Sequence, residues 1–243
     1  MNAIRVTARW VFILSIPVLL LSATLGWAFN SLWIYKNGFA KYDVGQSLRL
    51  SPAELDRSAQ ELIAYFNNTH QEFLDINVTY NTGETAPLFI DQNGNPDMND
   101  ILHMKDVKGL VWLDYRLFLG SAIYILGYVL VSLIRNRWHG RRDLALGVSW
   151  GGGATIALLC FLGVFAVTSF DWFFTTFHEI FFPQGNWQFP SWDHMITLFP
   201  DGFWSDVTLL VGLVTLGLAL AVGGLGLFWL RRIKKREHVP SQP

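Results

Sequence analysis

Four stretches without a charged residue constrain this chain of 243 residues more than any other feature. They cover residues 10–35, 117–134, 144–170 and 207–230, which are 26, 18, 27 and 24 residues long. An α-helix of about 20 apolar residues crosses a hydrocarbon core of about 30 Å. Each stretch is therefore predicted to span a membrane. The predicted fold class is an all-α membrane protein with four transmembrane helices.

The basic residues lie in three short segments that alternate with acidic connections. Residues 1–9, 135–143 and 231–243 hold 11 of the 18 Lys and Arg residues and only two acids, while 36–116 and 171–206 hold 17 acids. Cytoplasmic segments of membrane proteins carry an excess of Lys and Arg. Both termini and the short linker are therefore predicted to be cytoplasmic, and the two acidic connections to lie on the outer side.

These patterns divide the chain into nine segments. They are a cytoplasmic tail 1–9, span 10–35, an extracytoplasmic cap 36–116, span 117–134, a basic cytoplasmic linker 135–143, span 144–170, an interfacial aromatic segment 171–206, span 207–230 and a basic cytoplasmic tail 231–243. The first span is interpreted as an anchor because its uncharged run exceeds the hydrophobic region of a cleaved signal, about 7 to 15 residues. Small residues in the third and fourth spans predict close helix packing.

The cap has an α+β pattern. Ser51 and Glu54 form a capping box before an amphipathic stretch, which predicts a helix over 52–67. Residues 76–80 and 88–90 are expected to be short strands separated by a turn at 81–83. The oxygen-rich run 91–97 resembles a calcium loop, but Pro96 and Leu102 occupy positions where an EF-hand needs Gly and Glu. A solvated turn is therefore expected there.

Two histidines outside the spans are candidates for acid–base chemistry. A helix capped by Asn99 or Asp100 is expected to begin near Ile101 and continue into the second span, with His103 and Asp106 on one face. His178 lies in the aromatic segment 171–206. An imidazole accepts and donates protons near neutral pH, so two such rings that converge at the outer leaflet would make an acid–base pair.

Around these residues the sequence resembles the bacterial lipoprotein intramolecular transacylases. The resemblance is carried, in chain order, by His103-Met104-x-Asp106-Val107-Lys108, by Phe177-His178-Glu179-Ile180-Phe181-Phe182-Pro183 with Gly185-Asn186-Trp187-x-Phe189, and by Leu198-Phe199-Pro200-x-x-Phe203-Trp204. It implies transfer of the sn-2 acyl chain of a diacylglyceryl-modified N-terminal cysteine to the α-amine of the same lipoprotein, which leaves a lyso-form product. It also implies that His103 and His178 are the catalytic residues.

The chemistry of the residues is compatible with that activity. An α-amine must be neutral to attack an ester, so a neutral His103 would remove its proton while Asp106 fixes the imidazole tautomer. The developing oxyanion would be stabilised by a protonated His178 or a neighbouring donor. The supporting residues are predicted to be Asp106, Glu179, Lys105, Asn186 and Trp187. No metal or other cofactor is expected, and the lone Cys160 excludes an intramolecular disulfide framework and Cys-rich zinc sites. The expected partners are a diacylated lipoprotein N-terminus and membrane lipid, without nucleic acid, in a bacterial cytoplasmic membrane.

Three alternatives remain open at this point. The pairs His103 with Asp106, His178 with Glu179 and His194 with Asp193 offer ligands for zinc in a metal-dependent lipid hydrolase. The cap could instead be a non-enzymatic binding module for an envelope partner. A transporter ranks last because the spans contain no charged residue to mark a substrate path.

Overall fold

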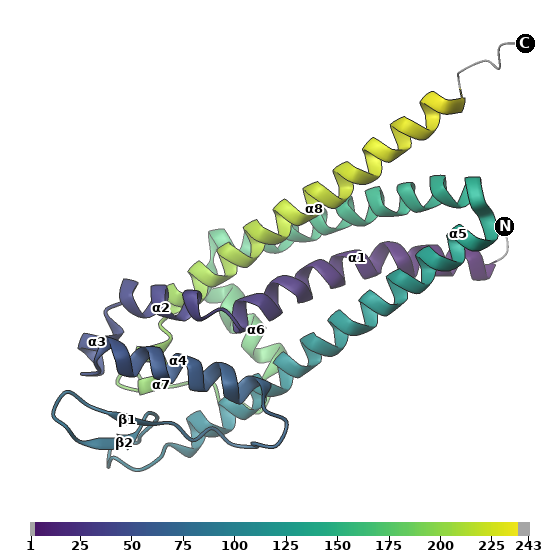
Figure 1. Ribbon diagram of the computed structural model, residues 1–243. Helices are drawn as coiled ribbons and strands as arrows, with labels where there is room; N and C mark the ends of the chain where they lie inside the picture. The colour runs from purple at the N-terminus through teal and green to yellow at the C-terminus, as the bar shows by residue number, and fades with distance from the viewer. Residues whose placement is uncertain (1–2, 238–243) are drawn as a thin grey trace, which may run out of the picture. The chain divides into compact units, whose positions relative to one another are not determined.

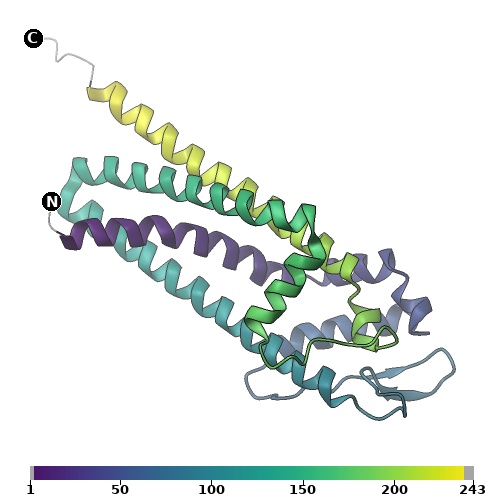
Figure 2. The same cartoon turned by 180° about the vertical axis from the view of Figure 1, so that it is seen from behind.

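The computed structural model describes residues 3–237, which form two compact units. Within the described residues, the bundle unit comprises 3–25, 114–164 and 211–237, and the cap unit comprises Gly26–Leu113 and Phe165–Leu210. Figures 1 and 2 show the chain from opposite sides. Predictions for residues 1–2 and 238–243, and for the side chains of 135–139 and 236–237, lie outside the described residues.

Three long helices supply the bundle unit: α1 (Ala3–Phe29), α5 (Met98–Thr168) and α8 (Asp201–Glu237). The helix α5 folds back between two apolar arms, Met98–Ile134 and Gly140–Thr168 (Figure 1). Each arm, and each of the other two helices, is long and apolar enough to cross a membrane, which confirms the four expected spans. Residues 135–143, the predicted linker, are helical.

Close backbone approaches hold the bundle unit together. A Cβ atom added at Gly152 of α5 would lie 2.7 Å from Cα of Gly223 in α8, and one at Gly151 would lie 2.4 Å from Ile16 Cδ1 in α1. Small residues let membrane helices pack at such short range, as the sequence predicts. Hydroxyl groups add a polar link, because Thr24 Oγ1 and Thr215 Oγ1 are 2.7 Å apart.

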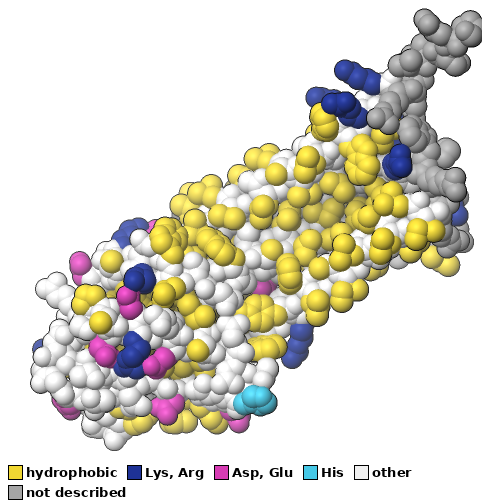
Figure 3. All heavy atoms as spheres, viewed as in Figure 1, with side chains coloured by type: hydrophobic (Ala, Val, Ile, Leu, Met, Phe, Trp, Pro, Cys, Tyr) yellow, Lys and Arg dark blue, Asp and Glu magenta, His cyan; other side chains and the backbone are white. Residues whose placement is uncertain are grey.

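The outer surface of the bundle unit is apolar. Side chains such as Ile123 and Leu126 are 62% and 63% exposed, and hydrophobic side chains cover the visible face of the long helices (Figure 3). Exposed apolar surface on this scale is costly in water and is normal against lipid. The pattern agrees with a multi-pass membrane protein.

The first uncharged run is not one helix. The helix α1 ends at Phe29, and the next residue, Asn30, donates from Nδ2 to the Gly26 carbonyl at 2.7 Å. The helix α2 (Leu32–Lys41) then begins at Leu32 and belongs to the cap unit. After the short α3 (Val44–Ser47), α4 (Pro52–Asn67) has the predicted bounds. Ser51 is the N-cap as predicted, since its Oγ accepts from the Glu54 N–H at 3.2 Å. The Glu54 carboxylate accepts instead from the Thr79 N–H at 3.1 Å and from Arg57.

The cap unit contains one antiparallel pair of strands, β1 (Asn77–Thr79) and β2 (Thr85–Pro87), with Val78 opposite Ala86. The first predicted strand is confirmed. The second strand was expected at residues 88–90, which is wrong, because β2 lies three residues earlier. The turn at Gly83, with φ of 87°, is tight, so the chain pairs with β1 again from Thr85.

Three further helical segments complete the cap unit: α6 (Phe170–Phe181), α7 (His194–Leu198) and the first residues of α8. An aromatic cluster joins α8 to α2, where Phe203 packs on Phe39 with ring centroids 6.5 Å apart. Gly38 makes this packing possible, because a Cβ there would lie 2.3 Å from Phe203 Cδ2. The segment 171–206 therefore contains helical structure packed into the cap unit, whereas its composition predicts only an aromatic interfacial region.

Candidate functional site: two histidines in an aromatic enclosure

The first turns of α5 present His103 to the interior of the cap unit. Asp97 is the N-cap, and its carboxylate accepts from the Asn99 N–H at 2.8 Å. The helix therefore begins at Met98, three residues before the predicted start, because Asp97 provides the cap expected of Asn99 or Asp100. His103 is buried, with 6% of its surface exposed, and its Nδ1 has no hydrogen-bond partner.

The helix α6 presents His178, the buried residue of that element. Its Nδ1 lies 2.8 Å from the Phe174 carbonyl oxygen, one helical turn earlier. A carbonyl oxygen only accepts, so Nδ1 carries a proton and Nε2 is the basic nitrogen of the neutral ring. Burial lowers the pKa of His178, and the Phe174 carbonyl opposes that shift. The ring is therefore neutral at pH 7 and able to accept a proton.

The two imidazoles come together from distant parts of the chain. Their ring centroids are 6.0 Å apart and the planes differ by 21°. Phe182 and Phe189 lie 4.8 and 5.4 Å from His103, and Trp187 lies 5.0 Å from His178. The convergence predicted from the sequence is present, inside an enclosure of aromatic rings.

Asp106 does not bind His103 Nδ1, the partner that the sequence predicts for it. Its Oδ2 accepts from Gln184 Nε2 at 2.6 Å and from Asn186 Nδ2 at 2.8 Å. Since His103 Nδ1 has no partner, Asp106 does not fix the imidazole tautomer through that atom. The carboxylate instead ties α5 to the segment that follows α6, and thereby holds Trp187 and Phe189 beside the histidines.

The other predicted supporting residues divide into two groups. Asn186 and Trp187 are half-buried and belong to the enclosure. Lys105 pairs with Glu72 at 2.6 Å, and Glu179 is exposed. His194, a possible ligand in the zinc alternative, has Nδ1 2.6 Å from the Leu88 carbonyl oxygen.

The zinc alternative finds no support in the described residues. Within them, the group of three or more His, Cys, Asp or Glu side chains close enough to share an ion consists of Asp97, Asp100 and Asp193. It contains none of the histidines.

Sequence reasoning missed the part played by Phe174 and the enclosing rings. A helix over 170–181 would have placed the Phe174 carbonyl four residues before His178, and the strong amphipathic pattern of that segment was the available signal. Phe182 and Phe189 stand in the quoted motifs, but their contacts with His103 depend on tertiary packing.

The fold and site define a class: a four-span helical membrane protein with a buried pair of histidines in its cap. The family model described as lipoprotein intramolecular transacylase Lit matches residues 10–204. The chain therefore belongs to the lipoprotein intramolecular transacylase family, which is a family of acyltransferases.

Solved structures share this fold. The membrane integral lipoprotein intramolecular transacylase Lit from Bacillus cereus superposes with a TM-score of 0.72 at 16% identity, over 98% of this chain and 100% of that one. A variant of it with a histidine changed to alanine gives a TM-score of 0.66 at 18% identity, over 95% and 94% of the two chains. These likenesses show the fold alone.

A relative by sequence is an uncharacterized protein of Aquifex aeolicus, 27% identical over 148 residues. The match covers 59% of this chain and 62% of that protein, so the chain spans less than two thirds of the relative's length.

Proposed function

We propose that this chain transfers the sn-2 acyl chain of a diacylglyceryl-modified N-terminal cysteine to the α-amine of the same lipoprotein, with His103 and His178 as the catalytic residues. Family membership supports the reaction class. The observation that carries the residue assignment is the pair of buried imidazoles 6.0 Å apart, from segments far apart in the sequence.

The general base in this proposal is His178. Attack of the neutral α-amine on the ester carbonyl forms an N–C bond and a tetrahedral oxyanion, and the nitrogen must then lose a proton. Nε2 of His178 accepts this proton, and the Nδ1 contact with the Phe174 carbonyl stabilises the resulting imidazolium. The same proton then passes to the glycerol oxygen as its C–O bond breaks. No proton is gained or lost overall, and no nucleophilic side chain is required.

His103 is the electrophilic partner in this proposal. A neutral imidazole has one N–H group, and the unpartnered Nδ1 of His103 leaves a polar atom available inside the enclosure. Substrate would provide its missing partner. An N–H group aimed at the oxyanion stabilises charge that develops only in the transition state. Burial lowers the pKa of His103 to about 4 and also lowers the pKa of His178, so both rings are neutral at pH 7. The sequence leaves open which histidine is the base, and His178 is assigned here because the Phe174 carbonyl defines its basic nitrogen.

The aromatic enclosure suits a reaction within one molecule. Donor ester and acceptor amine belong to the same lipid-modified cysteine, so the protein has to bring them together and exclude water that would hydrolyse the ester. Phe182, Phe189 and Trp187 supply apolar walls around the imidazoles. On α6, Trp172 and Ile180 are 52% and 65% exposed, which suits contact with acyl chains.

The active site is proposed to face the outer leaflet, with both termini in the cytoplasm. The charge distribution supports this orientation, because 17 acids fall in the two connections that contain His103 and His178. Lipoprotein N-termini with a diacylglyceryl group would then reach the site from the membrane.

Mass spectrometry of a lipoprotein N-terminal peptide tests the function. Cells that lack their own N-acylating enzyme would be compared with and without this chain. The proposal expects one acyl chain to move from glycerol to the α-amine with no change in total mass. Loss of an acyl chain would point to a hydrolase, and an unchanged peptide from cells with the folded protein would contradict the proposal.

A further inference from the structure

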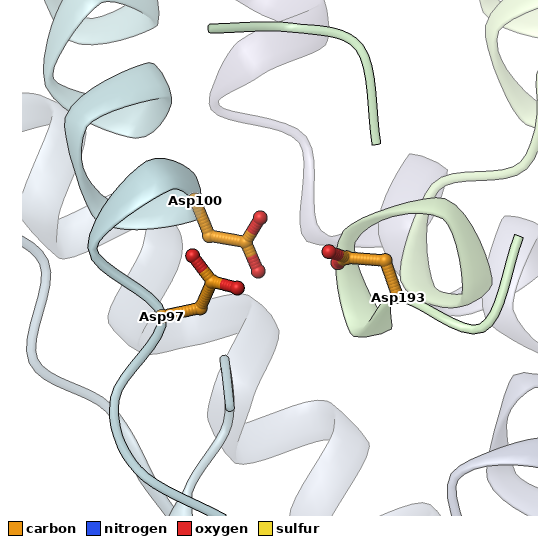
Figure 4. A group of neighbouring side chains, drawn as sticks. All are labelled: Asp97, Asp100 and Asp193. Atoms are coloured by element: carbon orange, nitrogen blue, oxygen red, sulfur yellow. The ribbon is translucent and has the colours of Figure 1, made fainter. Parts of the chain in front are cut away.

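Three carboxylates converge in the cap unit, next to the histidine site but separate from it. One oxygen each from Asp97, Asp100 and Asp193 lies within 4.8 Å of the others. Figure 4 shows Asp97 at the N-cap of α5, Asp100 in the first turn of α5 and Asp193 at the N-cap of α7, with their carboxylates directed toward one another. The group thus joins two segments almost a hundred residues apart in sequence.

The burial of the Asp100 carboxyl group points to a ligand. Its side chain is fully buried, with 0% exposed, and neither of its oxygens meets an N–H or O–H donor from another residue type. Its side-chain partner is the carboxyl group of Asp193, and burial beside that group raises the pKa of Asp100 to about 8. A buried carboxylate without partners is strongly unfavourable, and buried charges in proteins are paired or coordinate metals. Asp193 is almost as deeply buried, at 2% exposed. No Lys or Arg is among the hydrogen-bond partners of the three groups in the described part of the chain.

The oxygen atoms left free are sufficient for a hard cation. Oδ1 of Asp97 accepts from the Asn99 N–H, and Oδ1 of Asp193 accepts from the Met195 N–H at 2.7 Å. Each of the three residues brings one oxygen within 4.8 Å of the others, which gives three carboxylate ligands. Calcium takes six to eight oxygen ligands in a flexible geometry and completes its shell with water, whereas magnesium usually binds only one or two carboxylates.

We propose that Asp97, Asp100 and Asp193 bind a calcium ion that joins α5 to α7. The site shares only Asp97 with the calcium-like run 91–97, because Asp91 Oδ1 is held by the Asn93 and Asn95 N–H groups of its own turn.

The position of the ion gives it a role for the histidines. His103 lies one turn after Asp100 on α5, and Asp106 lies one turn after His103. Asp106 holds Gln184 and Asn186, while Asp100 faces Asp193. The segment that carries Trp187 and Phe189 is therefore fixed to α5 on both sides of His103, and the ion forms one of the two links. The three aspartates are positioning residues for the site rather than catalytic ones.

Ion binding is measured directly on the purified full-length protein in detergent. Terbium(III) serves as a luminescent substitute for calcium, with the neighbouring Trp192 as the sensitiser, and calcium displaces it in competition. The thermal unfolding midpoint is followed with added calcium and with chelator. We expect saturable binding in the range of about 10⁻⁵ to 10⁻³ M, a rise in the midpoint with calcium, and a smaller effect of magnesium.

Asp100→Asn keeps the size of the side chain and removes its charge, so it should weaken calcium binding by at least about tenfold. Asp75→Asn is the matched control, since Asp75 is an exposed carboxylate of the same unit and should leave binding unchanged. If Asp100→Asn does not fold, Asp193→Asn and the titration of the wild type with calcium still test whether the three aspartates bind the ion. These readouts do not depend on acyl transfer, so their failure is distinct from failure of the proposed function.

Absence of binding to the wild type at 10 mM calcium, with no shift on chelation, would overturn the proposal. A second result would also overturn it: neither protein binds terbium, and Asp100→Asn without calcium is as stable as the wild type with calcium. That result would show that the carboxyl groups share a proton instead of an ion.

Discussion

Replacement of His178 by Asn separates base chemistry from packing. The Asn side-chain amide can donate to the Phe174 carbonyl as Nδ1 of the imidazole does, but it has no basic nitrogen in place of Nε2. A positioned general base contributes about 10²- to 10⁴-fold to rate, which corresponds to about 2.7 to 5.4 kcal/mol of transition-state stabilisation. Turnover should fall by that factor while the protein stays folded.

The assay uses a synthetic diacylglyceryl-cysteine peptide in detergent, with N-acyl product quantified by mass spectrometry. His194→Asn is the matched control, because His194 makes the same kind of Nδ1 contact, with the Leu88 carbonyl, outside the histidine pair. This control should retain turnover within about twofold. A His178→Asn enzyme that also stays within tenfold of wild type would refute the assignment of Nε2 as the base.

Three further predictions concern the link, the pH response and the bundle. Asp106→Ala removes the acceptor for Gln184 and Asn186, so turnover should fall by about 10- to 100-fold with only a modest change in unfolding midpoint; an unchanged rate would contradict the positioning role. Because burial lowers the pKa of His178, the unfolded chain binds more protons between that pKa and about 6.5, so stability rises with pH across this window. Wild type should therefore lose stability relative to His178→Asn as the pH falls from about 7.5 to 5.5, and parallel unfolding curves would contradict this sign. Gly152→Ala places a Cβ 2.7 Å from Gly223 Cα and should cost about 1 to 3 kcal/mol of stability, measured by thermal unfolding. Gly153→Ala, where no atom lies within 4 Å, is its control, and equal behaviour of the two variants would refute the packing argument.

The spans could be predicted because a long uncharged run has few structural solutions. The helix 52–67 was equally accessible, since its capping box and apolar face are local features that agree with each other. The second strand failed by three residues because its register is set by the geometry of the turn at Gly83, which the apolar pattern of residues 88–90 does not encode.

The site shows the same division. His103 and His178 could be predicted as candidates from their residue type and from the order of the motifs around them. The distance between their rings could not, because it depends on how the 183–193 segment lies against α5. The partner of Asp106 was inferred from helix periodicity, which places it near His103; the actual partners, Gln184 and Asn186, are about 80 residues away in sequence. Asp193 and Asp100 meet for the same reason, and no local pattern relates them.

A crossover experiment tests the central claim, that the two histidines move an acyl chain within one molecule, most directly. One substrate carries deuterium in both acyl chains and ¹⁵N in its peptide, the other is unlabelled, and the mixture is given to wild type and to His103→Ala. The account predicts N-acylated products in which acyl and peptide labels stay together, and no product above background from the variant. Products with mixed labels, or full turnover by His103→Ala, would contradict it.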